Sequence, residues 1–437
     1  MTMSQVPART ITPVRKPLDA SVRLPGSKSL TNRALVCAAL ADGRSELHNV
    51  LFADDTEAMQ ECLRRMGISV EADHDADQLV VQGCGGTLPV DAAGATLDAR
   101  LSGTTARFLL PLLALAPGAT RLDGAAGLRA RPMADGIAAL RDLDVDVVED
   151  GSPGHLPVTV HGQTDRATLV TRAAMRDLTV SGEASSQFLS GLLLVAPAWP
   201  SGLRLTIADD LVSRPYVAMT TAVMRTFGAS LRQRGGTWTV PPQRYRAIRF
   251  EVEPDASAAS YVFAAAAICG GRVTVEGLGR HSLQGDAAFV DVLEQMGCRI
   301  TPDETRTTVE RSGELQGIDV TLSDLSDTAQ TLAAVAVFAS SPTRVRGIGF
   351  IRHKETDRVG NVVRELQRCG IRAAEEPDGF AVYPGSPVAA RVETYGDHRM
   401  AMSFALLGLR VPGIEITDPD CVVKTFPTYW DTLDGLR

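Results

Sequence analysis

One pattern constrains the fold of this chain more than any other: an amphipathic helix, a glycine and a β-rich segment recur together along it. Four segments carry mostly apolar residues at positions i, i+3, i+4 and i+7, which lie on one face of an α-helix. The glycine after each segment suits the left-handed conformation that commonly ends a helix. The four sets are Met59, Cys62, Leu63 and Met66 before Gly67; Thr220, Val223, Met224 and Phe227 before Gly228; Phe289, Val292, Leu293 and Met296 before Gly297; and Val359, Val362, Val363 and Leu366 before Cys369 and Gly370.

Two weaker copies complete the series. In the first, Met133, Ile137 and Leu140 lead into Asp142–Val148 without a glycine, and in the second, Tyr429–Leu436 closes the chain with Gly435. The β-rich segments of the four stronger copies are Ile68–Val70, Ser230–Gln233, Cys298–Thr301 and Ile371–Ala373. Successive copies are 65 to 85 residues apart. We therefore predict six α/β units, each long enough for two helices and several strands, arranged as two domains of three units.

Length and charge exclude several classes of protein. With 437 residues, 44% of them hydrophobic and 22% charged, the chain is long enough for two well-packed domains. Its net charge of −8 disfavours a general nucleic-acid-binding protein, which would usually be basic. An acidic protein binds anions only where its cations are gathered locally, so clusters of lysine and arginine are the informative sites.

Cysteine, histidine and apolar patterns favour a cytoplasmic protein without a metal. The seven cysteines form no CxxC pair, and the seven histidines lack zinc-ligand spacing. No signal peptide and no run of about 18 apolar residues is recognisable, so we expect no membrane association. The acidic segment Glu71–Asp77 lies between two expected strands, and we interpret it as a solvated turn rather than a metal site.

Cations and hydroxyls gather where helices are expected to begin. In Pro25–Arg33, a Pro-Gly turn brings three hydroxyls, Lys28 and Arg33 to the start of a helix expected over Ala34–Ala41, which suits a phosphate. The spacing is not that of a Walker A loop. A solvated helix cap is the alternative interpretation, because serine and lysine turns usually have that role.

Other expected helix starts carry their own signals. Asp54 followed by Glu57 predicts a capping box, and the Arg131-Pro132 and Arg214-Pro215 pairs place proline in a first turn beside a cation. Further clusters are Leu101–Arg107, where Gly103 permits close approach of a ligand; Arg129–Pro132, after the glycine-rich Asp123–Gly127; Ser185–Leu189; and Ser213–Tyr216. An ordinary helix entry or solvated surface is the alternative for each.

The segment Arg352–Arg358 combines cations with a carboxylate. Glu355 lies between Lys354 and Arg358, where its pKa would be lowered unless it is buried. The alternative is an exposed, mutually repulsive i,i+4 pair of the two cations on a helix.

Three further candidates follow the same logic. Tyr395–Met400 contains His398, Asp327 precedes a helix predicted over Thr328–Ala339, and Lys424 lies near the end of the chain. A structural histidine and a plain N-cap are the alternatives for His398 and Asp327.

Together, these clusters make the chain resemble the 5-enolpyruvylshikimate-3-phosphate (EPSP) synthase family of enolpyruvyl transferases. The likeness runs from about Pro25 to the C-terminus, and a chance match to ten ordered motifs is negligible. In chain order, the motifs are PGSKS with Arg33, SGTTARF, RARPM, SSQFLS, SRPY, EPDASAASY, LQGD, KETDR, YGDHRMAM and DPDCVVKTFP.

The resemblance implies an α/β fold of two similar domains, each made of three βαβαββ units in an inside-out α/β barrel. The active site would lie in a cleft between the domains that closes around the substrates. The chain would cross between domains near Leu24 and near Glu251–Pro254. Residues 1–24 and 254–437 would then form one domain, and residues 25–253 the other, which would carry most of the contacts to shikimate 3-phosphate.

The implied activity is that of a 3-phosphoshikimate 1-carboxyvinyltransferase in the shikimate pathway, which serves chorismate and aromatic amino-acid biosynthesis. The enzyme would transfer the enolpyruvyl group of phosphoenolpyruvate to the 5-hydroxyl of shikimate 3-phosphate by addition followed by loss of phosphate. No cofactor is implied, and glyphosate would be an inhibitor. We expect a cytoplasmic monomer that binds neither nucleic acid nor membrane.

The resemblance also assigns roles to residues of this chain. Asp327 would take the hydroxyl proton, Glu355 with Lys28 would move the proton onto and off the methylene carbon, and His398 would support them. Phosphoenolpyruvate would bind to Lys28, Arg131, Gln187, Arg358, Arg399 and Lys424. Shikimate 3-phosphate would bind to Ser29, Arg33, Ser185, Ser186, Ser213, Tyr216, Lys354 and Asp327, with Gly103 and Thr104 completing the substrate-binding set.

Departures and alternatives remain. Leu101 and Phe350 stand where many or some family members have asparagine, whereas Gly103 keeps the small residue of glyphosate-sensitive members. The sister enzyme that acts on UDP-N-acetylglucosamine is disfavoured, because the loop Gly124–Pro132 lacks that enzyme's reactive cysteine. A non-catalytic anion-binding relative is disfavoured because Lys28, Asp327 and Glu355 are all present, and an RNA-processing enzyme is disfavoured by the acidic charge.

Overall fold

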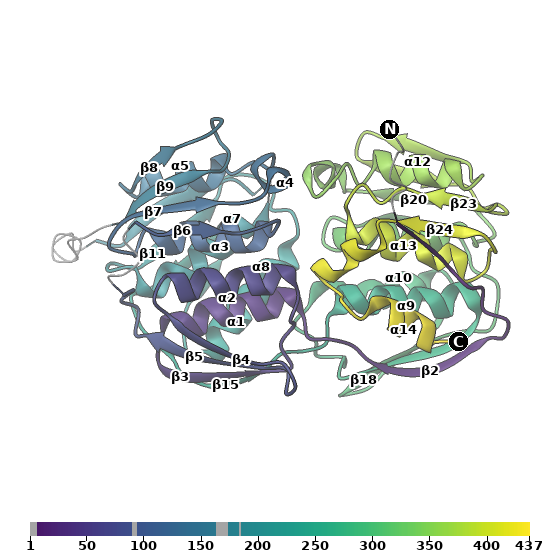
Figure 1. Cartoon of the computed structure of the whole chain (residues 1–437), viewed down its shortest axis with the longest axis horizontal. Helices are drawn as coiled ribbons and strands as arrows, with labels where there is room; N and C mark the ends of the chain where they lie inside the picture. The colour runs from purple at the N-terminus through teal and green to yellow at the C-terminus, as the bar shows by residue number, and fades with distance from the viewer. Residues whose placement is uncertain (1–6, 90–93, 163–173, 183–184) are drawn as a thin grey trace. The chain divides into compact units, whose positions relative to one another are not determined.

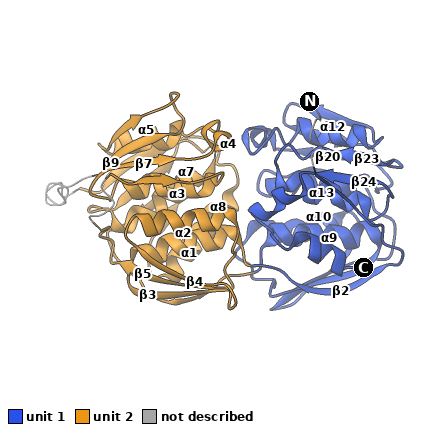
Figure 2. Ribbon diagram, in the orientation of Figure 1, with its two compact units in different colours: residues 1–25, 254–437 blue, residues 26–253 orange. Residues whose placement is uncertain are grey.

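The computed structural model describes residues 7–89, 94–162, 174–182 and 185–437. The chain forms two compact units, shown in different colours in Figure 2. The first unit joins Met1–Pro25 to Pro254–Arg437, and the second unit is Gly26–Glu253. Residues 1–6, which fall in the predicted N-terminal part of the first domain, lie outside the described residues.

Two segments of the second unit follow a complete βαβαββ order. In each, the first two strands are parallel and the last two add to the sheet in antiparallel fashion, giving the strand orders β6-β7-β9-β8 and β10-β11-β13-β12. The elements are β6 (Thr96–Asp98), α3 (Gly103–Leu113), β7 (Gly118–Asp123), α5 (Ala134–Asp142), β8 (Asp146–Glu149) and β9 (Val158–Gly162), with the short α4 (Ala126–Arg129) before α5; then β10 (Arg176–Val180), α7 (Ser186–Val195), β11 (Leu203–Ile207), α8 (Arg214–Thr226), β12 (Arg232–Arg234) and β13 (Thr237–Val240).

The third segment of the second unit is completed by strands from much later in the chain. The strand parallel to β3 comes from β14 (Tyr245–Arg246) and β15 (Arg249–Glu251), with Phe250 opposite Leu47. These strands therefore close the second unit just before the chain leaves it. The segment itself runs α1 (Lys28–Leu40), β3 (Ala41–His48), α2 (Asp54–Arg65), β4 (Ser69–Asp73) and β5 (Gln78–Cys84).

The first unit repeats this plan and uses N-terminal strands to complete two of its sheets. Strand β2 (Leu18–Arg23) pairs in parallel with β16, and β1 (Ala8–Thr10) pairs antiparallel with β24. The other elements are α9 (Ala256–Cys269), β16 (Gly271–Glu276), α10 (Phe289–Gln295), β17 (Arg299–Pro302) and β18 (Arg306–Arg311); β19 (Asp319–Thr321), α11 (Ala329–Ala336), β20 (Thr343–Arg346), α12 (Gly360–Arg368), β21 (Ala373–Glu376) and β22 (Gly379–Val382); and β23 (Ala390–Val392), α13 (His398–Gly408), β24 (Ile414–Thr417) and α14 (Tyr429–Gly435).

Helices fill the interior of each unit and the sheets lie around them (Figure 1). Helix α9 is buried along almost its whole length, as expected for a sequence that is apolar on every face. In the first unit α11 contacts α13, and in the second unit α3 contacts α7. The described residues form six sheets in this inside-out arrangement, which confirms the predicted fold class.

The repeated glycines have the predicted conformation. Gly67, Gly228, Gly297 and Gly370 have φ angles of 82°, 85°, 103° and 78° and directly follow the C-caps of α2, α8, α10 and α12. In the weaker copy after α5, Asp144 takes the same place with a φ of 61°. Aspartate tolerates this conformation better than most residues, which explains why the copy lacks a glycine.

Some expected element boundaries differ from the structure. In the copy that closes the chain, Gly435 is the last residue of α14. The N-cap of α2 is Ala53, whose N–H donates to Thr56 Oγ1 (3.1 Å), while Asp54 and Glu57 do not form the predicted capping box; both pair with Arg100 instead.

The two predicted helix-start prolines differ. Pro132 precedes the N-cap of α5, Met133, and so lies outside the helix, contrary to expectation. Pro215 lies in the first turn of α8, as predicted. Glu71–Asp77 spans the end of β4 and the exposed turn before β5, and the described residues contain no group of three side chains able to hold a metal ion.

Among the described helices, none is long and apolar enough to span a membrane.

Candidate functional site

The predicted site residues of the second unit lie mainly in the first turns of four helices. Helix α1 begins at Lys28, six residues earlier than expected, because Ser27 caps it by accepting a hydrogen bond from the N–H of Leu30 (3.4 Å). The Lys28 Nζ is 3.2 Å from Asp55 Oδ2, and Asp55 is almost fully buried on α2. Asp55 escaped the sequence reasoning, because nothing local distinguishes it from its neighbour Asp54.

Arg33 is a buried cation that organises its neighbours. Its Nε donates to Thr220 Oγ1 (2.8 Å), and its Nη groups donate to the carbonyls of Ser29 (2.9 Å) and Tyr216 (3.1 Å). Burial lowers the pKa of Arg33 to about 10. Thr220 Oγ1 in turn donates to Ser190 Oγ (3.0 Å), so one hydrogen-bonded chain connects α1, α7 and α8.

Gln187 is held at both ends of its amide. Its Nε2 donates to Thr104 Oγ1 (3.0 Å), and its Oε1 accepts from Arg107 Nη1 (2.8 Å). Arg107 also donates to the carbonyl of Pro132 (3.1 Å), next to Arg131. Arg107 lies in the SGTTARF motif but was not predicted as a site residue, since its role depends on which side chains the fold brings to it.

Gly103 begins α3, where Ser102 Oγ accepts from the N–H of Thr105 (3.2 Å). A Cβ at Gly103 would lie 2.8 Å from Arg131 Nη1, closer than real Cβ contacts allow. The absence of a side chain at Gly103 therefore leaves room for the Arg131 side chain at the start of α3. The adjacent Leu101 is 41% exposed.

The remaining predicted residues of this unit also lie at helix starts. Ser185 caps α7 by accepting from the N–H of Gln187 (3.2 Å), and Ser186 is the first residue of that helix. Ser213 precedes α8 with a left-handed φ of 54°, and Tyr216 lies in the first turn. Helix N-termini favour anions, so this half of the candidate site suits phosphate or carboxylate groups.

In the first unit, Arg358 is the centre of a buried ionic cluster. It is 2% exposed and contacts three carboxylates: Asp397 (Nε to Oδ2, 2.7 Å), Glu355 (Nη2 to Oε2, 2.7 Å) and Asp327 (Nη1 to Oδ1, 3.2 Å). Burial alone would disfavour its charge, but Asp397, Glu355 and Asp327 outweigh that effect and raise the pKa of Arg358.

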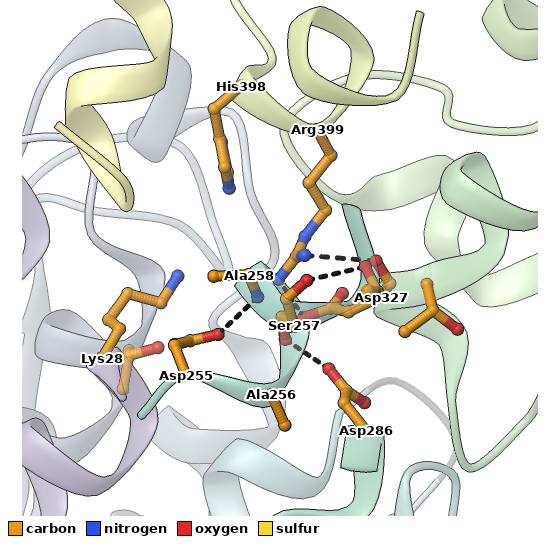
Figure 3. Close-up of polar contacts among 12 residues, drawn as sticks. Lys28, Asp255, Ala256, Ser257, Ala258, Asp286, Asp327, His398 and Arg399 are labelled. Atoms are coloured by element: carbon orange, nitrogen blue, oxygen red, sulfur yellow. Dashed lines mark hydrogen bonds and ion pairs between the residues drawn. The ribbon is translucent and has the colours of Figure 1, made fainter. Parts of the chain in front are cut away.

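Two more predicted cations join this cluster. Arg399 Nη2 lies 2.7 Å from Asp327 Oδ2 (Figure 3), and Lys424 Nζ lies 3.0 Å from Glu355 Oε1. Arg358, Arg399 and Lys424 thus come together although they are far apart in the sequence. We refer to these three cations with Asp327, Glu355 and Asp397 as the ionic cluster.

Two sequence interpretations need correction here. Glu355 pairs with Arg358, and a further cation, Lys424, also contacts it. Residues 349–353 form a 3₁₀ turn and α12 begins only at Gly360, so the alternative of a helical Lys354–Arg358 pair is wrong. Lys354 Nζ instead lies 5.9 Å from the ring centre of the partly buried Phe350.

The N-cap alternative for Asp327 is also wrong. Asp327 lies in a short 3₁₀ turn, Ser326–Thr328, and α11 begins at Ala329. Its carboxylate contacts Arg358 and Arg399 rather than the helix backbone. This arrangement presents a carboxylate whose partners are the cations expected to bind substrate.

Asp397 and His398 begin α13. Asp397 Oδ1 accepts from the N–H of Arg399 (2.9 Å) and thereby caps the helix, and His398 Nδ1 is 3.5 Å from the same oxygen. Both residues are buried. Asp397 lies in the YGDHRMAM motif, but no local pattern separates it from the surrounding polar residues.

A second buried acid near the cluster was also missed. Ser257 Oγ donates to Asp286, in the LQGD motif, as Figure 3 shows. Burial raises the pKa of Asp286 to about 6, with a further contribution from the negative charge of Asp327.

Comparison with known proteins identifies the family. The sequence model described as EPSP synthase (3-phosphoshikimate 1-carboxyvinyltransferase) matches residues 13–433. This chain belongs to the EPSP synthase family. Proteins named 3-phosphoshikimate 1-carboxyvinyltransferase are similar to it: that of Nostoc punctiforme is 46% identical over 95% of this chain and 96% of its own length, and that of Edwardsiella ictaluri is 40% identical over 98% of both.

Solved structures agree with this family in fold. The EPSP synthase of Acinetobacter baumannii superposes with a TM-score of 0.83 at 25% identity, covering 98% of both chains. The enolpyruvyl transferase NikO of Streptomyces tendae, at 19% identity, shares the fold with a TM-score of 0.74 over 98% of this chain and 97% of its own. The predicted family and enzyme class are therefore confirmed.

Proposed function

We propose that this chain transfers the enolpyruvyl group of phosphoenolpyruvate to the 5-hydroxyl of shikimate 3-phosphate. Family membership supports both substrates. The observation that carries the proposal is the ionic cluster, in which carboxylates form ion pairs with buried cations. An anionic substrate can replace a carboxylate as the partner of a cation, and the released carboxylate is then available to move a proton.

The binding roles proposed for individual residues follow from charge and position. Arg358, Arg399 and Lys424 would bind the phosphate and carboxylate of phosphoenolpyruvate, together with Lys28, Arg131 and Gln187 of the second unit. The hydroxyls and cations proposed for shikimate 3-phosphate are Ser29, Arg33, Ser185, Ser186, Ser213, Tyr216 and Lys354. Because two multiply charged anions repel each other, a dense set of cations is needed to hold them together.

The first step adds the acceptor to the double bond. Asp327 takes the proton of the 5-hydroxyl, and the hydroxyl oxygen forms a bond to C2 of phosphoenolpyruvate. The electron pair of the C2–C3 double bond takes a proton at C3, delivered by Glu355 with Lys28. The product of this step is a tetrahedral intermediate that still carries the phosphate on C2.

The second step reverses the proton transfer at carbon. Glu355 with Lys28 removes a proton from C3, the double bond re-forms, and the C2–O bond to phosphate breaks. The proton held by Asp327 leaves with the phosphate, so Asp327 ends as a carboxylate and Glu355 as the protonated acid, which are their states at the start of the next turnover. Every step uses side chains of this chain, with His398 proposed to support Glu355 and Asp327.

The remaining parts of the proposal concern the whole enzyme. We propose that residues 1–24 with 254–437 form one domain of the enzyme and that residues 25–253 form the other. The enzyme would act in the cytoplasm as a monomer, and it would bind neither nucleic acid nor membrane. Glyphosate would compete with phosphoenolpyruvate near Gly103 and Arg131.

Phosphate release tests the proposed reaction. The enzyme is incubated with phosphoenolpyruvate and either shikimate 3-phosphate or UDP-N-acetylglucosamine, and inorganic phosphate is measured. Release with shikimate 3-phosphate alone supports the proposal, whereas release with only the sugar nucleotide would assign the chain to the sister activity. Saturating glyphosate should reduce turnover at low phosphoenolpyruvate; unchanged turnover would refute the inhibitor assignment.

A carboxamide at Glu355 tests the proposed proton transfer. Glu355→Gln should bind both substrates yet lose at least about 100-fold in kcat, the usual contribution of general acid–base catalysis. Glu314→Gln, at an exposed glutamate, is the matched control and should keep full activity. Normal turnover of Glu355→Gln would remove Glu355 from the mechanism.

A further inference from the structure

Two loops of the first unit carry most of the ionic cluster, and helix α12 lies between them in the sequence. The loop 354–358 carries Glu355 and Arg358, and the loop 395–399 carries Asp397 and Arg399. Apart from His398 and Arg399, which begin α13, the residues of both loops lie outside strands and α-helices. Side-chain contacts therefore help to hold these loops in position.

Glu365 of α12 contacts the loop 395–399 and the residues just before it. Its carboxylate is fully buried and accepts hydrogen bonds from Tyr395 Oη (2.6 Å) and from the N–H of Glu393 (3.0 Å). Arg368 Nε lies 3.4 Å from it. A buried carboxylate is costly unless it is paired and hydrogen-bonded, so this geometry indicates a built anchor for the segment that begins at Glu393.

Tyr395 is held in a backbone conformation that it would not adopt by itself. Its φ is 56°, and Gly396 follows with a φ of 67°. Left-handed backbone is unfavourable for a bulky residue and persists only where its surroundings enforce it. The hydroxyl of Tyr395 is held by Glu365, and Asp397, which pairs with Arg358, follows two residues later.

The same helix also contacts the first loop. Arg364 Nη1 lies 3.5 Å from Tyr395 Oη and also donates to Asn361 Oδ1. Asn361 Nδ2 donates to Thr356 Oγ1 (2.5 Å), and Thr356 follows Glu355 directly. An unbroken hydrogen-bonded path therefore runs from one loop of the ionic cluster to the other along α12.

We propose that this path, formed by Thr356, Asn361, Arg364, Glu365 and Tyr395, positions the ionic cluster for phosphoenolpyruvate. None of the five is proposed to touch a substrate. They are positioning residues: Tyr395 fixes Asp397 and Arg399 through its hydroxyl, and Thr356 fixes Glu355 and Arg358. The inference rests on the proposed function, because it assigns the positioned cations to phosphoenolpyruvate.

Tyr395→Phe tests this role by removing one hydroxyl and leaving the ring. The loss of a hydrogen bond to a buried charge should release the strained turn and misplace Arg399, which we expect to lower kcat/KM for phosphoenolpyruvate about tenfold. The KM for shikimate 3-phosphate should change less than about twofold, since most of its proposed contacts belong to the other unit. A merely structural role would affect both substrates alike.

The chain offers a matched control. Tyr383→Phe removes the hydroxyl of another tyrosine in the same unit. The ring of Tyr383 lies against Arg372, whose Cζ is 4.1 Å from the ring centre. The Tyr383→Phe variant should behave as the unaltered enzyme. Glu365→Gln keeps one carbonyl oxygen as an acceptor for Tyr395 and should lose less than Tyr395→Phe, and combining the two substitutions should add little further loss, because both act through the same bond.

Two measurements test the positioning role independently of the proposed reaction. If Tyr395→Phe matches Tyr383→Phe within about twofold, or loses affinity for both substrates equally, the positioning role is wrong while turnover of the unaltered enzyme still supports the proposed function. Calorimetric titration with phosphoenolpyruvate needs no turnover. A binding constant about tenfold weaker in Tyr395→Phe than in Tyr383→Phe supports the inference, and equal constants overturn it.

Discussion

Arg358→Lys is the sharpest test of the ionic cluster, because it keeps the positive charge and removes only the geometry. The guanidinium contacts three carboxylates through different nitrogens, at 2.7 Å for Asp397, 2.7 Å for Glu355 and 3.2 Å for Asp327. A lysine ammonium is a single point of charge on a flexible stem and cannot reproduce this fork. It can reach one carboxylate well, and the other two then lose their contact with residue 358.

The expected loss of stability follows from the carboxylate contacts that lysine cannot make. A hydrogen bond to a charged group contributes roughly 1.5–3 kcal/mol, and breaking a buried ion pair costs roughly 3–5 kcal/mol. Arg399 and Lys424 still neutralise Asp327 and Glu355, so the greater loss concerns Asp397, which is fully buried. We therefore expect the substitution to lower the free energy of unfolding by about 3–4 kcal/mol.

Thermal unfolding measures this loss. For a unit of this size, about 3–4 kcal/mol corresponds to a decrease in Tm of roughly 6–16 °C. Arg346→Lys is the control, because Arg346 forms an exposed pair with Asp319 and should change stability by less than about 0.5 kcal/mol. An Arg358→Lys protein that melts within about 2 °C of this control would refute the idea that fork geometry stabilises the cluster.

Two further predictions concern single side chains. Gly103→Ala places a Cβ 2.8 Å from Arg131 Nη1, so the arginine side chain must move. Steady-state kinetics should then show a KM for phosphoenolpyruvate about tenfold higher and weaker inhibition by glyphosate. An unchanged KM would contradict the proposed crowding of Arg131. Asp286→Asn tests the pKa of about 6 that burial, and secondly Asp327, impose on this acid. Because the pKa is raised above the ordinary 3.8, the protonated form stabilises the fold at low pH, and stability falls as pH rises from about 4 through 6, by on the order of 3 kcal/mol. The asparagine variant should lack this part of the decline in chemical unfolding curves at pH 4.5 and 7.5; parallel curves for the two proteins would contradict the prediction.

Much of the fold was predictable because its signals are local. The apolar stripes of α2, α8, α10 and α12 and the glycines after them depend only on residues within two helical turns. The errors are local as well: Asp54 lies one residue inside α2 rather than at its cap, and α1 begins at Lys28 because Ser27 supplies the cap. Such boundaries depend on which of several polar residues the backbone uses.

The candidate site was predictable to the extent that its residues lie in family motifs. The cations Arg358, Arg399 and Lys424 were identified in this way, and the structure brings them to one cluster. Asp55, Arg107 and Asp397 were not, because each is significant only through a partner far away in the sequence. The burial of Asp397 and its contact with Arg358 appear only in the folded structure.

The amino-acid sequence by itself determined the repetition of six units, the glycines that follow four of the helices and the kinds of side chain available for binding anions. Only the tertiary structure decided which of those side chains meet. Lys424 contacts Glu355 from far along the chain, Asp327 pairs with two cations instead of capping a helix, and β2 and β15 complete sheets begun elsewhere in the chain. The physical reason is that periodicity and capping act over a few residues, whereas ion pairs and sheet edges form between segments that only the folded path of the chain brings together.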